Sequence, residues 1–129
     1  MGEFSHVWTI NGKKTQVWDA FVNADTVDAW GGGPSQFSLA VGGTFSMWDG
    51  DVFGTFQEVV PLSEFKQEWY ASKDWAHPSH LSVTLHETHG STTVTLTHTD
   101  IPESEVKSIT EGWEEFFMVP LKDFVEQDQ

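Results

Sequence analysis

The chain has 129 residues, of which 20 are Asp or Glu and only 6 are Lys, while Arg and Cys are absent and the formal net charge is −14. The missing Cys excludes disulfides, Fe–S clusters, Cys-ligated zinc and thiol catalysis. A strongly acidic chain without Arg repels phosphate backbones and anionic lipids, so nucleic-acid and membrane-surface binding are excluded as functions. The length fits one domain over residues 1–129.

The ends of the chain carry no targeting signal. No apolar run approaches the roughly 20 residues of a membrane span. The first six residues, Met1–His6, lack the basic region and the apolar core of a signal peptide. We therefore expect a cytoplasmic protein. The acidic excess fits either a host with high internal salt or a simple solubility device.

The first third of the chain predicts one strand and two short helices. Residues Phe4–Ile10 alternate between apolar and polar types and end at a turn, which is typical of a strand. Helical spacing of apolar residues follows over Thr15–Val22, with Thr15 as the expected N-cap. A second helix is expected over Thr26–Trp30, begun by Asp25. Three glycines and a proline, residues 31–34, end it.

The middle of the chain predicts five short strands. They are expected at Thr44–Trp48, Val52–Val60, Phe65–Ser72, Leu81–His86 and Thr92–Thr99. Asp49-Gly50 predicts a tight hairpin between the first two. In the last strand Val94, Leu96 and His98 share one face, and Thr93, Thr95 and Thr97 share the other. We expect the threonine face to be solvated, as in an antiparallel sheet covered on one side.

A long helix is expected after Ile101-Pro102, because proline is well tolerated in the first turn. Its apolar stripe comprises Val106, Ile109, Trp113, Phe116, Phe117, Leu121 and Phe124. Since Pro120 lies inside this pattern, a kink is expected near residues 116–119.

These elements predict an α+β domain in which a curved six-stranded antiparallel sheet wraps around the long C-terminal helix. The two short helices after the first strand would fill one end. Seven Trp and ten Phe are many bulky rings for this length, so either they pack as a solid core or they leave a cavity between helix and sheet. The expected lining of that cavity is Trp30, Phe45, Met47, Phe56, Trp69, Leu85, Leu96, Trp113 and Phe117.

Two polar residues are candidate anchors in such a cavity. His98 lies on the covered face of its strand, where it could anchor a ligand or act as a general base, or could simply be hydrogen-bonded inside the core. Glu58 shares a strand face with Gly54 and Phe56 by simple alternation. Glu58 therefore lines the cavity, or else it faces solvent or pairs with a Lys.

Catalytic and metal-binding signatures are absent from the sequence. The six His form no HExxH or facial His-Glu-His set, so no metal site is expected. No nucleophile elbow or triad order occurs. The glycines at 31–33 precede proline instead of a helix with Lys, which excludes a phosphate loop and suggests a flexible gate beside Trp30. We expect no enzyme activity and no cofactor.

A set of residues in fixed order resembles a known family. The set comprises Val17-Trp18-Asp19-Ala20-Phe21, Trp30, residues 41–50, Val59-Val60-Pro61, Trp69, Leu96-Thr97-His98, Ile101-Pro102 and Gly112-Trp113. It is similar to the C-terminal domain of the activator of the heat-shock-protein-90 ATPase and to its bacterial single-domain homologues, in the helix-grip (START-like, SRPBCC) superfamily. The resemblance runs from about Phe4 to Val125 and implies a helix-grip fold.

The resemblance implies less about activity. In the eukaryotic co-chaperone a separate N-terminal domain carries much of the chaperone contact, and this chain is too short to contain one. Relatives across the superfamily bind lipids, hormones or polyketides, or catalyse cyclisation. We therefore expect binding of a small apolar or amphipathic ligand, with two alternatives: a co-chaperone domain that stimulates a chaperone ATPase, and a small cyclase-like or hydrolase enzyme. A monomer or weak homodimer is expected.

Overall fold

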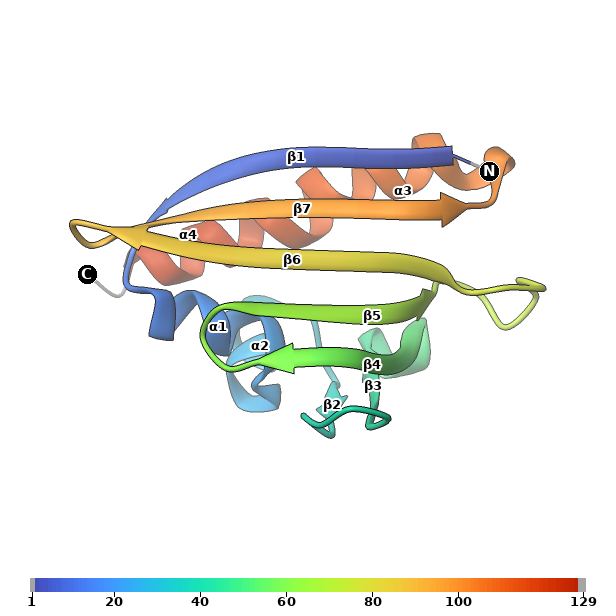
Figure 1. The fold of residues 1–129 in the computed structure, drawn as a ribbon, viewed down its shortest axis with the longest axis horizontal. Coiled ribbons are helices and arrows are strands. Elements are labelled where there is room, and N and C mark those ends of the chain that lie inside the picture. Colours follow the sequence, from blue (N-terminus) through green and yellow to red (C-terminus); the bar gives the residue numbers. More distant parts are fainter. Residues whose placement is uncertain (1, 128–129) are drawn as a thin grey trace.

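The computed structural model describes residues 2–127. The elements are β1 (Gly2–Asn11), α1 (Lys14–Val22), α2 (Ala24–Trp30), β2 (Gln36–Phe37), β3 (Thr44–Met47), η1 (Trp48–Gly50), β4 (Val52–Val60), β5 (Glu64–Tyr70), β6 (Ser79–Thr88), β7 (Ser91–Ile101), η2 (Glu103–Glu105), α3 (Val106–Gly112), η3 (Trp113–Met118) and α4 (Val119–Gln127). Figure 1 shows one sheet with the helices behind it. The predicted α+β class is therefore confirmed.

The strands form one antiparallel sheet in the order β1-β7-β6-β5-β4-β3-β2. The prediction of six strands is wrong by one, since the sheet has an additional strand, β2. It pairs with β3 at only two positions, Gln36 with Ser46 and Phe37 with Phe45. So short a strand lies within a run of turn-forming residues and has no periodicity of its own. The predicted strand at the N-terminus and the five that follow it are all present, with ends shifted by a few residues.

The two short helices are present, but other residues cap them. At α1 the backbone N–H of Lys13 donates to the side-chain oxygen of Gln16, and the predicted cap Thr15 lies inside the helix. At α2 the Asn23 side chain accepts from the N–H of Thr26, whereas Asp25 lies in the first turn. The predicted caps were displaced because both helices begin earlier than the apolar spacing indicated.

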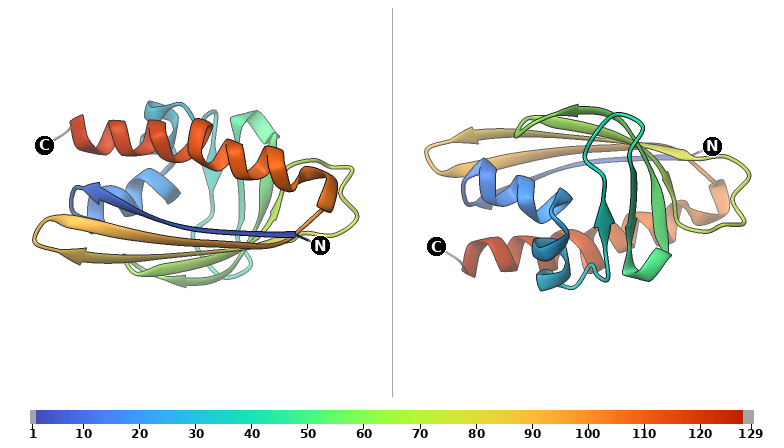
Figure 2. Two further views of the ribbon diagram at one scale, coloured as in Figure 1. Left: turned by 90° about the horizontal axis from the view of Figure 1, so that it is seen from above. Right: turned by 90° about the horizontal axis from the view of Figure 1, so that it is seen from below.

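Strand β7 shows the predicted alternation. Val94, Leu96 and His98 are fully buried against the helical layer, and Thr93, Thr95 and Thr97 lie on the outer face. This pattern is that of an antiparallel sheet with one covered side. In Figure 2 the helices all lie on that covered side.

The C-terminal helical run contains a π-helical segment, η3, which ends two residues before Pro120. Proline offers no N–H to the carbonyl of Phe116 and its ring crowds that carbonyl, so a wider turn relieves the clash. In this segment the irregularity expected near residues 116–119 takes the form of a π-helix. The inward positions then recur every four residues, at Trp113, Phe117, Leu121 and Val125.

One member of the predicted apolar stripe is therefore misplaced. Phe116 is 64% exposed, whereas Phe124 packs partly buried against the core and Met118 and Val125 are buried in it. The prediction assumed a uniform period of 3.6 residues, which the π-helical segment interrupts.

No helix among residues 2–127 is long and apolar enough to cross a membrane.

The sheet curves toward the helical layer at its β3–β4 end. Figure 2 shows β3, η1 and β4 bending up until η1 lies level with the C-terminal helix. At the opposite edge α3 and α4 contact β1. The C-terminal helix thus packs against the β1 edge of the sheet. On its other side it faces the curved part formed by β3, η1 and β4, called the curled wall below.

Candidate functional site

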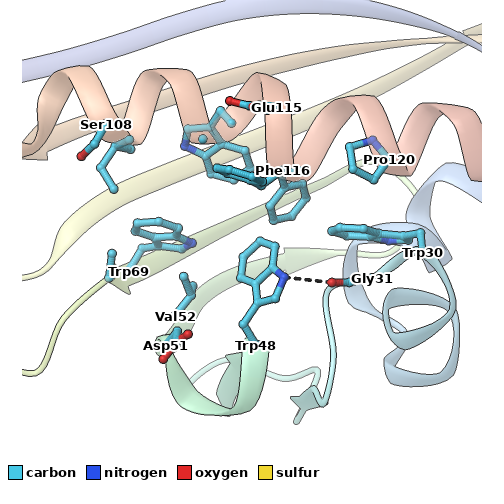
Figure 3. A pocket seen from close by; sticks show the side chains of 15 residues that line it. Trp30, Gly31, Trp48, Asp51, Val52, Trp69, Ser108, Glu115, Phe116 and Pro120 are labelled. Atoms are coloured by element: carbon cyan, nitrogen blue, oxygen red, sulfur yellow. Dashed lines mark hydrogen bonds between the residues drawn. The ribbon is translucent and has the colours of Figure 1, made fainter.

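A groove of about 530 Å³ lies between the C-terminal helix and the curled wall. Figure 3 shows the helix above it and the β3–β4 turn, β5 and the end of α2 below. The fifteen residues that line the groove are Trp30, Gly31, Trp48, Asp51, Val52, Trp69, Ala71, Ser108, Ile109, Gly112, Trp113, Glu115, Phe116, Phe117 and Pro120. The groove is open to solvent on one side and is large enough for a small organic molecule.

Six of the fifteen lining residues contribute aromatic rings to the groove wall. Trp48 stands edge-on to Phe117, with ring centres 5.9 Å apart and planes 75° apart. Trp113 and Phe117 lie 4.4 Å apart on the helix. Trp30 contacts Phe117 from the end of α2, at 5.0 Å. Rings supplied by four separate elements therefore meet on one concave surface, whose chemistry is aromatic and apolar.

Hydrogen bonds hold two of these rings in place. The indole N–H of Trp30 donates to the carbonyl of Ala20 at 2.7 Å, and that of Trp48 donates to the carbonyl of Gly31 at 2.9 Å, the bond drawn in Figure 3. Gly31 has a φ of 110° and ends α2 in the left-handed conformation, which suits glycine. The bond ties the end of α2 to η1 across one end of the groove.

The indole of Trp69 is different. Among the described residues, none accepts a hydrogen bond from its N–H, although the residue is only 5% exposed. Figure 3 shows its nitrogen on the side of the ring that faces Trp48 across the groove. The buried N–H that lacks a partner is that of Trp75, whose ring is 6.2 Å from that of Trp69 but does not line the groove. Among the described side chains that line the groove, the indole of Trp69 thus offers a free N–H that is accessible from the groove.

Two acidic side chains border the groove on opposite walls. Asp51 belongs to the curled wall and Glu115 to the helix, and both are exposed. None of the fifteen lining residues is basic. The groove therefore combines an apolar interior with a negatively charged rim.

His98 lies beneath the groove and is fully buried. Its Nδ1 accepts from the indole N–H of Trp113 at 2.9 Å, so its proton is on Nε2, which donates to Ser79 Oγ at 2.7 Å. The Ser79 hydroxyl in turn donates to the carbonyl of Trp69 at 2.6 Å. Burial, with a smaller contribution from nearby His80, lowers the pKa of His98 from 6.5 to about 3. His98 is thus neutral and occupied on both nitrogens.

Glu58 lies on the outer face of the sheet, and its predicted common face with Phe56 is wrong. The pairing between β4 and β5 shifts at residue 57: Phe56 is opposite Gln67, but Glu58 is opposite Lys66. This bulge turns the following residue to the other face. The Glu58 carboxylate lies 3.8 Å from the Lys66 ammonium group, and its side chain is 45% exposed. This is the Lys pairing left open as the alternative.

The predicted cavity residues fall into separate groups. Trp30, Trp69, Trp113 and Phe117 line the groove. Met47 lies beside Trp69 and Trp113 at a second, nearly closed space of about 10 Å³. The others with apolar side chains pack in the core: Phe45, Phe56, Leu85 and Leu96. The sequence left open whether the aromatic rings form a solid core or leave a cavity. Both occur, since most of the rings pack in the core and a few border the groove.

Sequence reasoning missed several groove residues, notably Trp48, Ile109 and Phe116. Trp48 was assigned to the end of a strand, whereas it takes up a left-handed conformation with φ of 49° at the β3–β4 turn. The available signal was Asp49-Gly50, which marks a turn that can carry a neighbouring side chain out of the strand direction. Phe116 was assigned to the core by its helical spacing.

Among residues 2–127 no group of three His, Asp or Glu side chains could hold a metal ion. His80 lies in β6. Its Nδ1 is 2.7 Å from an Asp100 carboxylate oxygen on the outer face of the sheet. The polar side chains available at the groove are therefore those of Trp69, Asp51, Glu115 and Ser108, whose hydroxyl donates to the carbonyl of Glu105.

Comparison with known proteins gives a family and a set of distant relatives. The family described as "Activator of Hsp90 ATPase homolog 1-like protein" matches residues 12–126. The human "Activator of 90 kDa heat shock protein ATPase homolog 1" is 26% identical over 109 residues, which are 83% of this chain and 32% of the human protein. The mouse protein of the same name matches over the same shares. The chain thus spans about a third of the length of these relatives.

Solved structures share the fold. An HSP90 activator from Plasmodium falciparum has a TM-score of 0.82 and 23% identity, with 91% of each chain covered. CalU16 from Micromonospora echinospora has a TM-score of 0.81 and 19% identity, covering 98% of this chain and 77% of that one. The Aha1 dimer from Colwellia psychrerythraea has a TM-score of 0.79 and 19% identity, with 98% and 97% covered. At these identities the likeness establishes the fold alone.

Proposed function

The chain belongs to the family of Activator of Hsp90 ATPase homolog 1-like proteins, and we propose that it binds a small apolar or amphipathic molecule in the groove. The single observation that carries this proposal is a concave space of about 530 Å³ with aromatic walls. Well-formed apolar pockets with a few polar groups are the usual sites of small-molecule binding. The helix-grip fold supports the proposal, because it sets a helix across a curved sheet.

The groove can be tested with a neutral apolar dye and one helical position. Gly112 lines the groove, and a Cβ added there meets only Phe116 Cδ2, at 3.9 Å. Gly112→Phe therefore fills the groove without a backbone clash, and Gly112→Ala is the matched control. We expect wild type and Gly112→Ala to bind Nile red with similar Kd, and Gly112→Phe to lose most binding. Equal binding by all three, or no binding by wild type, overturns the proposal.

A second candidate function is stimulation of a chaperone ATPase. The family match and the human relative, which is named as an ATPase activator, favour this function. The chain spans only about a third of that relative, so the activity of the whole relative remains a proposal for this chain. The test adds the purified protein to the 90-kDa heat-shock protein of its own host and measures ATP turnover. An unchanged turnover rate over a range of protein excess rejects this candidate.

We propose no catalytic reaction. The two polar side chains predicted as candidate anchors do not converge: Glu58 is on the outer face of the sheet, and His98 is buried under the groove with both ring nitrogens hydrogen-bonded. A cyclase or hydrolase would need at least two polar groups aimed at one point of the cavity. Turnover of a groove-bound ester by wild type, lost in Gly112→Phe, would contradict this proposal.

A cytoplasmic location and a monomeric or weakly dimeric state also remain proposals. The structural neighbour from Colwellia psychrerythraea is described as a dimer, and β1 and β2 are sheet edges here. Light scattering coupled to size-exclusion chromatography over a range of protein concentrations tests the oligomeric state. A molar mass that rises toward twice 14.5 kDa with concentration supports the weak dimer.

A further inference from the structure

The groove offers one unused hydrogen-bond donor to a ligand. Four tryptophans line it, and the indole N–H groups of Trp30, Trp48 and Trp113 all donate to protein acceptors. Among the described residues nothing accepts from Trp69, which is only 5% exposed but whose indole nitrogen is not sealed from the groove. A ligand that fills the groove displaces water from this donor, so it must offer an acceptor or leave the N–H unsatisfied at a cost in free energy. A ligand that places an acceptor at Trp69 Nε1 meets this condition.

The charge around the groove also selects among ligands. Asp51 and Glu115 lie on its two opposite walls, and no lining residue is basic. The whole protein carries a formal charge of −14, which attracts cations and repels anions such as fatty acids. The rim therefore favours a positively charged group over a neutral or a negative one.

Aromatic faces at the same rim add to this preference. Phe116 follows Glu115 directly on the helix and is 64% exposed, and Trp48 is half-buried on the facing wall. Organic cations are attracted to aromatic faces, most strongly when carboxylates are nearby and water is partly excluded. This aromatic rim with its nearby carboxylates therefore suits a quaternary ammonium group better than a compact, strongly hydrated ion.

We propose that the groove selects an amphipathic organic cation whose apolar body carries a hydrogen-bond acceptor. The acceptor takes the Trp69 N–H, the apolar body packs on Trp113 and Phe117, and the cationic group lies between Asp51 and Glu115. This inference rests on the proposed binding function and specifies the chemical class of the ligand. It does not depend on whether a chaperone is also bound.

Three probes of one shape test the two polar requirements separately. The reference probe is 2-naphthoylcholine, which has an aromatic body, an ester carbonyl and a quaternary ammonium. Its uncharged counterpart is 3,3-dimethylbutyl 2-naphthoate, in which carbon replaces the nitrogen. The third probe is 4-(2-naphthyl)butyltrimethylammonium, in which two methylene groups replace the ester, so it keeps the charge and has no oxygen acceptor. Kd values follow from tryptophan fluorescence or calorimetry at low salt.

Wild type is expected to bind the choline ester about tenfold more tightly than the neutral ester, since cation–aromatic and carboxylate attraction act together. The double variant Asp51→Asn, Glu115→Gln should lose that preference. Glu111→Gln is the matched control, because Glu111 carries the same charge on the same helix but does not line the groove. The control should retain the preference.

Trp69→Phe removes the N–H and keeps a ring. Wild type is expected to bind the choline ester about fivefold more tightly than the cation without an acceptor, the usual worth of one hydrogen bond, and Trp69→Phe should bind the two equally. Because Trp69 also packs in the core, the ratio of these two Kd values in wild type provides a test that requires no substitution. An equal Kd for these two probes in wild type overturns the assigned role of Trp69.

The outcomes separate this inference from the proposed function. If both esters bind equally and Gly112→Phe abolishes their binding, the groove is a binding site and its preference for cations is refuted. If the neutral ester binds more tightly than the cation, the same conclusion holds. If no probe binds and Nile red does not bind either, the proposed binding function itself fails.

Discussion

The two sides of one aromatic pair, Trp69 and Trp113, differ in how completely their polar groups are satisfied. On the sheet side, Trp113 donates to His98, His98 to Ser79, and Ser79 to the carbonyl of Trp69. On the groove side the same two rings, 5.8 Å apart, form an open wall, and the N–H of Trp69 has no partner among the described residues.

This contrast separates a structural polar cluster from a candidate binding surface. A closed chain of hydrogen bonds in a dry interior makes a core rigid and leaves nothing for a ligand to satisfy. An open aromatic wall with an unpaired donor leaves that possibility. His98, the most suggestive residue in the sequence, therefore belongs to the region that holds the wall in place.

The largest expected effect comes from breaking the closed side. His98→Ala should lower the free energy of unfolding by about 3–5 kcal/mol, because it leaves a cavity and deprives Trp113 Nε1–H and Ser79 Oγ of their partner. Urea denaturation followed by circular dichroism measures the change. His80→Ala, on the outer face with a side chain 42% exposed, is the matched control and should change stability far less. Equal losses would contradict the contrast.

The pH dependence of stability tests the same residue without relying on a cavity. His98 has a pKa of about 3 in the folded protein, against about 6.5 when unfolded, so between these values only the unfolded chain takes up the proton. Its stabilising contribution is complete above pH 6.5 and should fall by about 1.4 kcal/mol per pH unit below it, until pH approaches 3.

Urea titrations of wild type and His98→Gln at several pH values between 7 and 4 isolate this slope. The difference between the two proteins should shrink as pH falls, since glutamine does not titrate. Parallel stability curves would show that His98 is not held neutral by its buried position.

On the open side, the helix itself has room for an added methyl group. Gly112→Ala should raise the free energy of unfolding by about 0.5–1 kcal/mol, because alanine favours the helical conformation and its Cβ meets no close neighbour. Gly54→Ala serves as the opposite control on the sheet, where a Cβ would overlap the Glu68 carbonyl oxygen, and it should destabilise. A destabilised Gly112→Ala would mean that the groove is less open than described.

The smallest effect is expected at the outer face. Glu58→Gln removes an exposed ion pair with Lys66 and should change the free energy of unfolding by less than about 0.5 kcal/mol. The Kd for Nile red should not change, because Glu58 does not line the groove. Loss of dye binding in this variant would place the ligand elsewhere on the molecule.

Regular periodicity explains both what sequence analysis predicted and where it was wrong. Strict alternation placed Val94, Leu96 and His98 correctly on the inner face of β7, which has no bulge over those residues. The same rule placed Glu58 wrongly, because a bulge at residue 57 reverses the faces. A period of 3.6 residues likewise assigned Phe116 to the core, although the π-helical segment turns it outward.

The candidate site was predicted only in part for a related reason. Trp30, Trp69, Trp113 and Phe117 were expected to line a cavity and do line the groove. The rest of the lining comes from a turn with left-handed backbone at Trp48 and from exposed helix positions. Such residues have no apolar periodicity that could mark them as neighbours of a site.

Residue order and composition by themselves determined the family resemblance, the α+β class, the succession of strands and helices and the acidic character of the surface, because these depend on local spacing and on counts of charge. Tertiary structure alone decided which aromatic rings are enclosed in the core and which line the groove. That outcome depends on hydrogen bonds between distant positions, such as His98 with Ser79 and Trp113, and on how far the sheet curls beside the helix.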